Sequence, residues 1–289
     1  MLEPWLEIAT VAERIDAASE AAGIDLRAHG TTSDADAIRD TAVAQPLLVS
    51  TAIATGRELL GDTIPGLTAG HSIGEFGAAA FAGVLTDAEA MSLVSVRARA
   101  MAEAAANSEA TSMAAVLGGD PDEVAAKLAD LGLTPANMNG GGQVVAAGSK
   151  EAITALVADG PEKARVIELQ VAGAFHTEYM APAVEVLAAA AAQISPAEPQ
   201  ATLLSNADGA AVESGADALS RMVKQIANPV RWDLCQEALV AAGVSALVEV
   251  APGGVLTGLA KRSKLGIPAV AIKTPEDLDK ARDLIKEHA

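Results

Sequence analysis

The chain has 289 residues, 51% of them hydrophobic and only 2% aromatic, so it is long enough to bury a large core of small aliphatic side chains without disulfides or metals. Its net charge of −18 excludes proteins that bind nucleic acid through a basic surface and disfavours binding to an anionic membrane. The single cysteine, Cys235, excludes an intramolecular disulfide, and we find no signal peptide and no apolar run of about 20 residues, so we expect a cytoplasmic protein.

The N-terminal part of the chain is predicted to be helical. Apolar residues recur at helical spacing over residues 5–22, and Gly23 is expected to end that helix. Residues 31–40 are polar and predict a short helix with a turn. Residues 41–60 are mostly apolar and predict a buried helix that leads the chain into the core.

The next stretch, Gly70-His71-Ser72-Ile73-Gly74-Glu75, lies between a predicted short strand at residues 66–69 and a predicted helix at residues 76–81. A serine in G-x-S-x-G between a strand and a helix is typical of a nucleophile elbow, in which a sharp turn exposes the hydroxyl at a helix N-terminus. The two glycines permit the tight turn because they have no side chains. We therefore predict that Ser72 is a nucleophile, the alternative being an ordinary Gly-Ser turn.

The helix after the elbow is expected to begin at a capping box formed by Thr86 and Glu89 and to run to about residue 106. It carries Arg97, and an arginine can hold a carboxylate through two parallel N–H bonds. On the sequence alone, Arg97 is either such a ligand or an ordinary surface or ion-pair residue.

The middle of the chain has a different pattern. Residues 111–172 predict strand, helix, strand, strand, helix and strand in that order, which is the ferredoxin-like arrangement. On both sides of this segment strands alternate with helices, which predicts a mostly parallel sheet covered on both faces. We therefore predict an α/β protein, with a hydrolase-like core from residues 1–110 and 173–289 and an inserted small α+β subdomain at residues 111–172.

A serine nucleophile needs a base to take its proton, and the chain has four histidines. His29 lies in a polar loop before the core, His71 adjoins Ser72 so that its side chain leaves the turn in another direction, and His288 is near the C-terminus. His176 remains, in a loop between a predicted strand and a predicted helix, where α/β folds place functional groups. We predict that it is the base, the alternative being a core or surface histidine. No acidic residue is marked as the third group that would orient it.

Five short motifs follow one another along the chain. They are the elbow, Arg97 with Met101, Gly173-Ala174-Phe175-His176, Asn228-Pro229-Val230-Arg231-Trp232 and Glu249-Val250-Ala251-Pro252-Gly253-Gly254-Val255-Leu256. In this order and at these intervals they resemble the malonyl-CoA:acyl-carrier-protein transacylases, the acyltransferases of type II fatty acid synthesis. The resemblance covers nearly the whole chain, and it implies a hydrolase-like α/β core with an inserted ferredoxin-like domain.

The resemblance implies a role for each matching residue. Ser72 matches the acylated serine, His176 the general base, and Arg97 the arginine that pairs with the malonyl carboxylate. Gln225 matches the residue whose backbone carbonyl orients the histidine, which would explain the missing acid. Ile73, directly after the nucleophile, would donate one N–H to the oxyanion.

The resemblance also implies residues around the substrate. Phe175 matches the A-F-H signature of malonyl-selective acyltransferases, whose ring crowds the space that an α-methyl group would need; the alternative is a core phenylalanine. His71 and Met101 are expected to bind substrate. Asn137 and Asn139 both lie where the family has a pocket asparagine, and the sequence does not choose between them.

The reaction and its partners follow from the same resemblance. Malonyl-CoA would acylate Ser72, and the phosphopantetheine thiol of acyl carrier protein would then take the malonyl group, with no metal and no cofactor. We expect a monomer that binds neither nucleic acid nor membrane. Because carrier proteins are acidic, as this chain is, docking must use a local basic patch. Two candidate clusters are Lys261, Arg262 and Lys264, and Arg221 and Lys224. The alternative for either cluster is a solvated helix end.

The resemblance breaks at the start of the chain. Family members open with a core strand followed by G-Q-G-x-Q, whose second glutamine supplies another oxyanion N–H, whereas this chain begins at Leu2-Glu3-Pro4-Trp5. Loss of one oxyanion donor costs about 10²- to 10³-fold in rate. We therefore expect that the start site is misplaced or that the sequence is truncated; if the chain is real as written, we expect weak or absent activity and low stability.

Two other functions stay open. Ser72 and His176 would also serve a serine thioesterase or esterase, for which Arg97 would not matter with uncharged acyl groups. A member lacking the second oxyanion donor could instead bind carrier protein without catalysis. A covalent malonyl adduct on Ser72 distinguishes the transferase from such a binding protein, and removal of Arg97 distinguishes it from the esterase.

Overall fold

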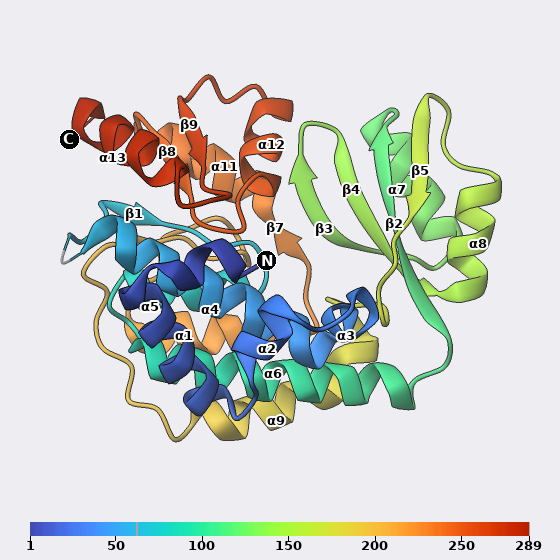
Figure 1. The fold of residues 1–289 in the computed structure, drawn as a ribbon. Coiled ribbons are helices and arrows are strands. Elements are labelled where there is room, and N and C mark those ends of the chain that lie inside the picture. The colour runs from blue at the N-terminus through green and yellow to red at the C-terminus, as the bar shows by residue number, and fades with distance from the viewer. Residues whose placement is uncertain (62, 289) are drawn as a thin grey trace.

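The computed structural model describes residues 1–61 and 63–288 (Figure 1). Figure 1 shows a larger, mainly helical part and, beside it, a smaller part in which a twisted sheet lies against helices. Most strands of this smaller sheet are drawn in green and yellow, so they come from the middle of the chain. The C-terminal segments, drawn in orange and red, return to the larger part.

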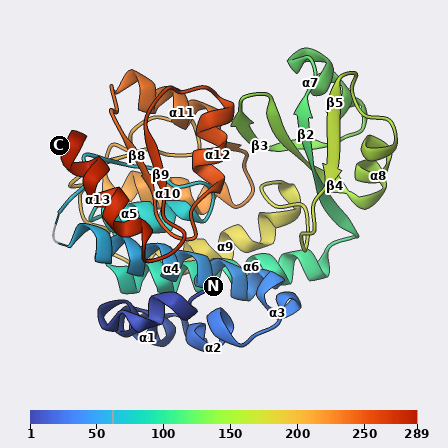
Figure 2. The same cartoon turned by 45° about the horizontal axis from the view of Figure 1, so that its top comes forward.

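Helices from the first third of the chain make up much of the larger part. They are the 3₁₀ helix η1 (Glu3–Glu7) and the α-helices α1 (Ala9–Ala22), α2 (Leu26–Thr31), α3 (Ala35–Arg39), α4 (Thr41–Leu60), α5 (Gly74–Phe81) and α6 (Asp87–Asn107). The sequence predictions for two helix ends are confirmed, since Gly23 ends α1 in the left-handed conformation and Thr86 and Glu89 form the capping box of α6. Figure 2 shows α4, α6 and α9 (Ala181–Ala191) as neighbouring helices, and α6 packs against both of the others.

Two short pairs of strands complete the larger part. β1 (Leu67–Thr68) pairs with β6 (Thr202–Leu203), and β8 (Leu247–Glu249) pairs with β9 (Ala269–Ala271), each in parallel. The remaining helices are η2 (Glu178–Met180), α10 (Gly215–Gln225), α11 (Trp232–Ala241), α12 (Val255–Arg262) and α13 (Asp277–His288). Parallel strands that are separated along the chain by helices confirm the predicted α/β class.

The smaller part is built on a five-stranded sheet with the order β5-β2-β4-β3-β7. Its elements are β2 (Thr111–Gly118), α7 (Pro121–Asp130), β3 (Thr134–Gly140), β4 (Gln143–Ser149), α8 (Lys150–Ala158), β5 (Ala164–Glu168) and β7 (Val230–Arg231). The first four strands pair antiparallel in the ferredoxin-like order, whereas β7 lies parallel to β3. Val116, Leu128 and Ile153 are buried between the sheet and its two helices.

β7 joins the two parts, because it comes from the larger part and pairs with the edge of the smaller sheet. It brings the start of α11 against the end of β3, where Gln236 Nε2 donates a 2.7 Å hydrogen bond to the Asn139 carbonyl oxygen. At the opposite edge, β5 ends at Glu168, before the expected end at residue 171, and just beyond it the Leu169 N–H still donates to the Met113 carbonyl oxygen of β2 at 2.9 Å. The boundary between the two parts therefore runs along β3.

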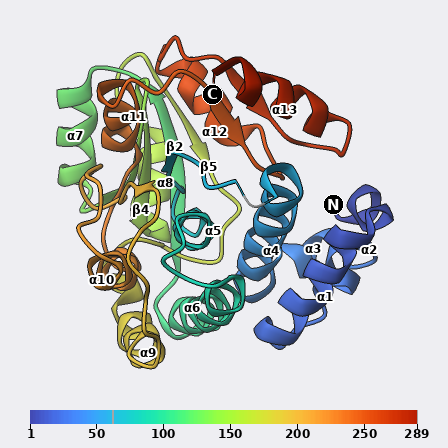
Figure 3. The same cartoon turned by 90° about the vertical axis from the view of Figure 1, so that its left-hand side faces the viewer.

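α5 lies in the middle of the larger part, where it contacts α4, α6 and α10 (Figure 3). It directly follows β1, so the strand, turn and helix of the sequence motif sit at the centre of the fold. Within the described residues no helix has both the length and the apolar composition needed to cross a membrane. The same part of the chain holds no group of three or more His, Cys, Asp or Glu side chains arranged to bind a metal ion.

Candidate active site

Ser72 lies at the apex of a strained turn between β1 and α5. Its φ of 53° is in the left-handed region, which serine rarely adopts. The turn is so tight that a Cβ on Gly70 would lie 2.0 Å from the carbonyl carbon of Gly74, so only glycine fits at residue 70. This is the geometry of a nucleophile elbow, and it holds the Ser72 hydroxyl at the N-terminal end of α5.

His176 lies against this hydroxyl, in the loop before η2. Its Nε2 is 2.8 Å from Ser72 Oγ, and its Nδ1 is 2.9 Å from the backbone carbonyl oxygen of Gln225. Because a carbonyl can only accept, Nδ1 carries the proton, and Nε2 is left to accept the proton of the serine hydroxyl. A backbone oxygen therefore occupies the position that an acid occupies in a Ser-His-Asp triad.

Burial keeps this imidazole neutral. The residue is 4% exposed, and burial, followed by the positive charge of Arg97, lowers the pKa of His176 to about 3. Above that pH the ring carries one proton, on Nδ1. Across the neutral range the side chain can therefore act as a proton acceptor from Ser72.

Arg97 is fully buried in α6 and points into the same site. Its Nη1 donates to the side-chain oxygen of Gln45 on α4, and its Nη2 donates to Ser72 Oγ at 3.2 Å and to Gln225 Oε1 at 3.3 Å. Burial lowers the pKa of Arg97 to about 10, so the guanidinium is still charged at pH 7. All of these acceptors are neutral, and no acidic side chain in the described part of the chain forms an ion pair with it.

Met101 and Phe175 border this arrangement. Met101, one turn further along α6, accepts a hydrogen bond from Gln45 Nε2 at Sδ with a length of 3.7 Å. Phe175, directly before His176, is partly buried and packs against both the core of the larger part and the apolar side chains of the five-stranded sheet. Met101 therefore shares with Arg97 its contact to Gln45, whereas Phe175 packs between two apolar clusters directly before His176.

His71 points away from Ser72, toward β3. Its Nε2 is 2.8 Å from Asn139 Oδ1, and its ring meets the Trp232 ring edge-on, with the centroids 5.6 Å apart. Of the two asparagines that the sequence left open, Asn139 makes this contact, while Asn137 lies in β3 opposite Val145 of β4 and Val230 of β7. The histidine beside the nucleophile thus connects the elbow to the smaller sheet.

Two backbone N–H groups at the elbow differ in their surroundings. The Ser72 N–H donates to Asn206 Oδ1 at 2.7 Å, so it is occupied. The Ile73 N–H, at the N-terminal end of α5, has no hydrogen-bond acceptor within residues 1–61 and 63–288. It is therefore open to an oxygen on which negative charge develops.

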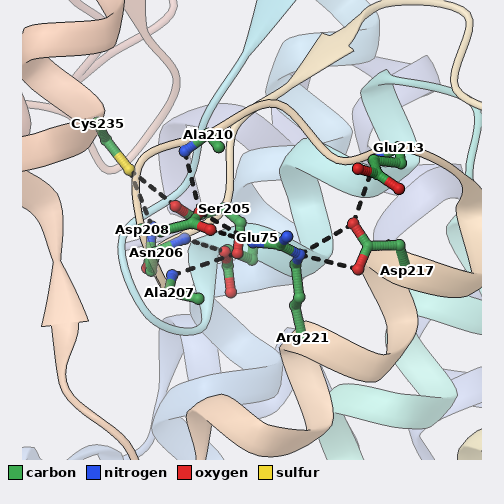
Figure 4. Close-up of polar contacts among 10 residues, drawn as sticks. All are labelled: Glu75, Ser205, Asn206, Ala207, Asp208, Ala210, Glu213, Asp217, Arg221 and Cys235. Atoms are coloured by element: carbon green, nitrogen blue, oxygen red, sulfur yellow. Dashed lines mark hydrogen bonds and ion pairs between the residues drawn. The ribbon is translucent and has the colours of Figure 1, made fainter.

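Three buried polar residues support the site without having been singled out as site residues from the sequence. Asn206, in the turn after β6, holds both ends of the elbow, because its Nδ2 also donates to the Gly70 carbonyl oxygen at 2.8 Å. Glu75 lies beside Asn206 (Figure 4), and Gln45 holds Arg97. The sequence held a signal for two of them: Asn206 is a polar residue directly after a strand, and Glu75 is an acid within an apolar helix.

One of the two candidate docking clusters has to be corrected. Figure 4 shows Arg221 between Asp208 and Asp217, with ion-pair distances of 2.8 and 2.9 Å. Its charge is neutralised locally, and it is half-buried, so it does not offer a free cation to an acidic partner. Lys224 of that cluster is exposed near the end of α10, and Lys261, Arg262 and Lys264 lie together at the exposed end of α12.

An elbow serine in contact with a neutral histidine on an α/β fold defines the class of serine enzymes that transfer or hydrolyse acyl groups. Comparison with known proteins narrows the class. The chain belongs to the acyl transferase domain family, whose sequence pattern matches residues 8–267.

Curated relatives and solved structures within this family resemble the chain over nearly its whole length. It is 49% identical to the malonyl CoA-acyl carrier protein transacylase of Mycobacterium tuberculosis, covering 98% of this chain and 95% of the relative. It is 35% identical to that of Escherichia coli K12, with coverages of 95% and 91%. The crystal structure of MCAT from M. tuberculosis matches with a TM-score of 0.93 at 49% identity, covering 97% of this chain and 94% of that one. The structure of a type II PKS acyl-carrier protein in complex with its malonyl-transacylase matches with a TM-score of 0.90 at 32% identity, covering 98% of this chain and 94% of that one.

Proposed function

We propose that this chain transfers a malonyl group from coenzyme A to the phosphopantetheine thiol of acyl carrier protein, through a malonyl ester on Ser72. The observation that carries the proposal is the surroundings of one oxygen. Ser72 Oγ is 2.8 Å from a neutral imidazole and 3.2 Å from a buried guanidinium that has no ion-pair partner among the described residues. The imidazole suits acyl transfer, and the guanidinium suits an acyl group that ends in a carboxylate. The names of the relatives at 49% and 35% identity support the same activity.

In the first half-reaction, Arg97 binds the free carboxylate of malonyl-CoA. Ser72 Oγ attacks the thioester carbonyl carbon while its proton passes to His176 Nε2, and the Ile73 N–H stabilises the negative oxygen of the tetrahedral intermediate. The C–S bond then breaks, the proton on His176 passes to the departing sulfur, and coenzyme A leaves. The Gln225 carbonyl stabilises the transient imidazolium, because it accepts from Nδ1 in both protonation states.

The second half-reaction reverses these roles. The pantetheine thiol of the carrier protein gives its proton to His176 Nε2 as its sulfur attacks the malonyl ester, and Ser72 Oγ leaves with that proton. One thioester is replaced by another through an ester, so the transfer needs no external energy. Phe175 beside the base limits the room next to the α-carbon of the acyl group, Met101 lies beside the Gln45 that holds Arg97, and His71 supports the elbow from the side of β3.

Covalent capture tests the proposal directly. The protein is incubated with malonyl-CoA alone, and its intact mass and peptide map are recorded. We expect a malonyl adduct on Ser72 that disappears when acyl carrier protein is added and malonyl-carrier protein forms. Ser72→Ala should give no adduct. Binding of carrier protein without any adduct, or release of free malonate in place of transfer, would contradict the proposal.

The pH dependence of acylation should show the lowered pKa of His176. An ordinary imidazole with a pKa of about 6.5 is mostly protonated at pH 5 and would lose about 30-fold in rate there. Because the pKa of His176 is lowered to about 3, its neutral form persists, and kcat/KM should change less than about twofold between pH 7 and pH 5. Malonyl-N-acetylcysteamine, which has no phosphates, is the appropriate substrate. A decline centred near pH 6.5 would show that burial does not control this base.

Docking of the acidic carrier protein is expected at the exposed basic end of α12, although the chain as a whole is acidic. Reversing two charges there, as Lys261→Glu with Arg262→Glu, should raise KM for carrier protein about tenfold at low salt and leave acylation by malonyl-CoA unchanged. Arg14→Glu with Arg39→Glu, which reverses two exposed cations on α1 and α3, is the control of equal charge change and should have no effect. Equal effects of both changes would point to net charge instead of a local patch.

A further inference from the structure

Glu75 is a buried acid at the centre of the fold for which the proposed reaction has no step. It lies on the first turn of α5, only three positions after Ser72, and is 4% exposed. Burial raises its pKa to about 8, so its surroundings are poor in water. A carboxyl group kept in such a place is costly unless its oxygens are used.

Both oxygens of this carboxyl group are used, and each one reaches a different segment of the chain. Oε1 accepts the backbone N–H of Asn206 at 2.6 Å, in the turn after β6, and Oε2 accepts a hydrogen bond from Gln225 Nε2, at the end of α10. Figure 4 shows the first of these contacts. Arg97 and Arg221 supply the nearby positive charge, and Cys235 is the other titratable group close by. Arg221 itself is paired with Asp208 and Asp217.

The two partners of Glu75 are the residues that hold the reacting groups. Asn206 accepts the Ser72 N–H and donates to the Gly70 carbonyl, so it fixes the turn that carries the nucleophile. The Gln225 backbone oxygen accepts a hydrogen bond from His176 Nδ1, and Gln225 Oε1 accepts one from Arg97 Nη2. Because Gln225 Nε2 is directed to Glu75, its Oε1 is left to face the guanidinium.

We propose that Glu75 is a positioning residue for the transfer reaction. It links Asn206, which holds the turn of the nucleophile, to Gln225, which holds the base and the carboxylate-binding arginine. This inference rests on the proposed function, since it assigns a role within the same site. Its backbone N–H donates to the Ser72 carbonyl oxygen at 3.1 Å, but within the described residues its carboxyl group has no hydrogen bond to Ser72 Oγ or to His176, so the carboxyl group acts through Asn206 and Gln225. Two donors converge on its carboxyl group, and an amide of the same shape offers one oxygen for both.

The test compares Glu75→Gln with a matched structural carboxylate. Glu249 accepts three backbone N–H bonds of 2.8, 2.8 and 2.9 Å at the start of α12, away from the elbow. Both Glu75→Gln and Glu249→Gln should lower Tm. Only Glu75→Gln should slow the single-turnover acylation of Ser72, by about tenfold or more, while KM for malonyl-CoA changes less than about threefold. A folded Glu75→Gln protein that acylates within twofold of wild type would overturn the proposal.

A second readout separates this inference from the proposed function. A fluorophosphonate probe labels an activated serine without requiring malonyl recognition, so it reports on Ser72 and His176 even if the wild-type protein forms no malonyl adduct. Labelling should slow about tenfold in Glu75→Gln and stay unchanged in Glu249→Gln. Should Glu75→Gln not fold, Glu75→Asp gives the answer, because its shorter carboxylate cannot span both partners. Slower labelling of Glu75→Asp supports the positioning role, and labelling at the wild-type rate refutes it.

Discussion

Replacing Arg97 with alanine is expected to turn a malonyl-selective enzyme into one that no longer distinguishes malonyl from acetyl groups. The guanidinium is fully buried beside Ser72 Oγ and is hydrogen-bonded only to neutral oxygens. A two-pronged bond between arginine and a carboxylate in such a site contributes about 3–4 kcal/mol, so kcat/KM for malonyl-CoA should fall about 10²- to 10³-fold. Acetyl-CoA makes no such bond, and its turnover should be spared or should increase.

Two further variants make this prediction specific. Arg97→Lys keeps the charge but cannot form two parallel bonds, so it should recover only part of the loss. Arg99→Ala removes an arginine from the same helix whose Nη1 lies 3.5 Å from the Ala22 carbonyl oxygen, and it should behave like wild type. The measurement is kcat/KM for both acyl-CoA substrates. A similar loss for acetyl-CoA and malonyl-CoA would mean that Arg97 holds the fold of the site and does not read the carboxylate.

Replacing His176 with alanine should remove nearly all acyl transfer while the protein stays folded. The imidazole is the group placed to take the Ser72 proton, and removal of such a base from a serine enzyme costs about 10⁴-fold or more in kcat. The change removes the hydrogen bond from Nδ1 to the Gln225 carbonyl oxygen, which still accepts the Asn228 N–H at 3.1 Å, so the loss of this bond should reduce the free energy of unfolding by about 0.5–1.5 kcal/mol. Rapid-quench measurement of malonyl-Ser72 formation, together with thermal unfolding, separates the two effects.

A histidine outside the site provides the comparison. His29 lies on α2, where its Nδ1 is 3.0 Å from Ser33 Oγ, and it is distant in sequence from the elbow. The variant His29→Ala should therefore be acylated at the wild-type rate. If His176→Ala retained more than about a tenth of the wild-type acylation rate, another group would have to be the base.

Much of the fold follows from local sequence signals. The capping box at Thr86 and Glu89, the glycine that ends α1 and the order of elements over residues 111–172 all depend on neighbouring residues, and the structure agrees with them. β7 could not be predicted in this way. It is a two-residue strand, Val230–Arg231, whose assignment depends on pairing with β3, nearly a hundred residues earlier in the chain. Contacts of this kind are set by tertiary packing and leave no periodicity.

The site residues likewise fall into those with a local sequence signal and those that depend on distant contacts. Ser72 stands out because the elbow pattern is local, and His176 was reached by elimination among only four histidines. The part played by the Gln225 backbone oxygen could be suggested only by family resemblance, since any residue has such an oxygen. Asn206 and Glu75 escaped notice as site residues because their importance depends on burial and on partners more than a hundred residues away. Arg221 was overestimated in part because its ion pair with Asp208 depends on tertiary packing, although the pair with Asp217, four residues earlier on α10, follows helical spacing and was a signal available in the sequence.

The cation beside Ser72 has a consequence for the resting protein. The same guanidinium that touches the nucleophile also lowers the pKa of His176, after burial the largest cause of that shift. An anionic tail that settles on Arg97 cancels part of this field and so makes the imidazole more basic. Binding of a carboxylate at Arg97 should therefore raise the pKa of His176, so that the imidazole becomes a stronger base when an acid-tailed acyl group is in place.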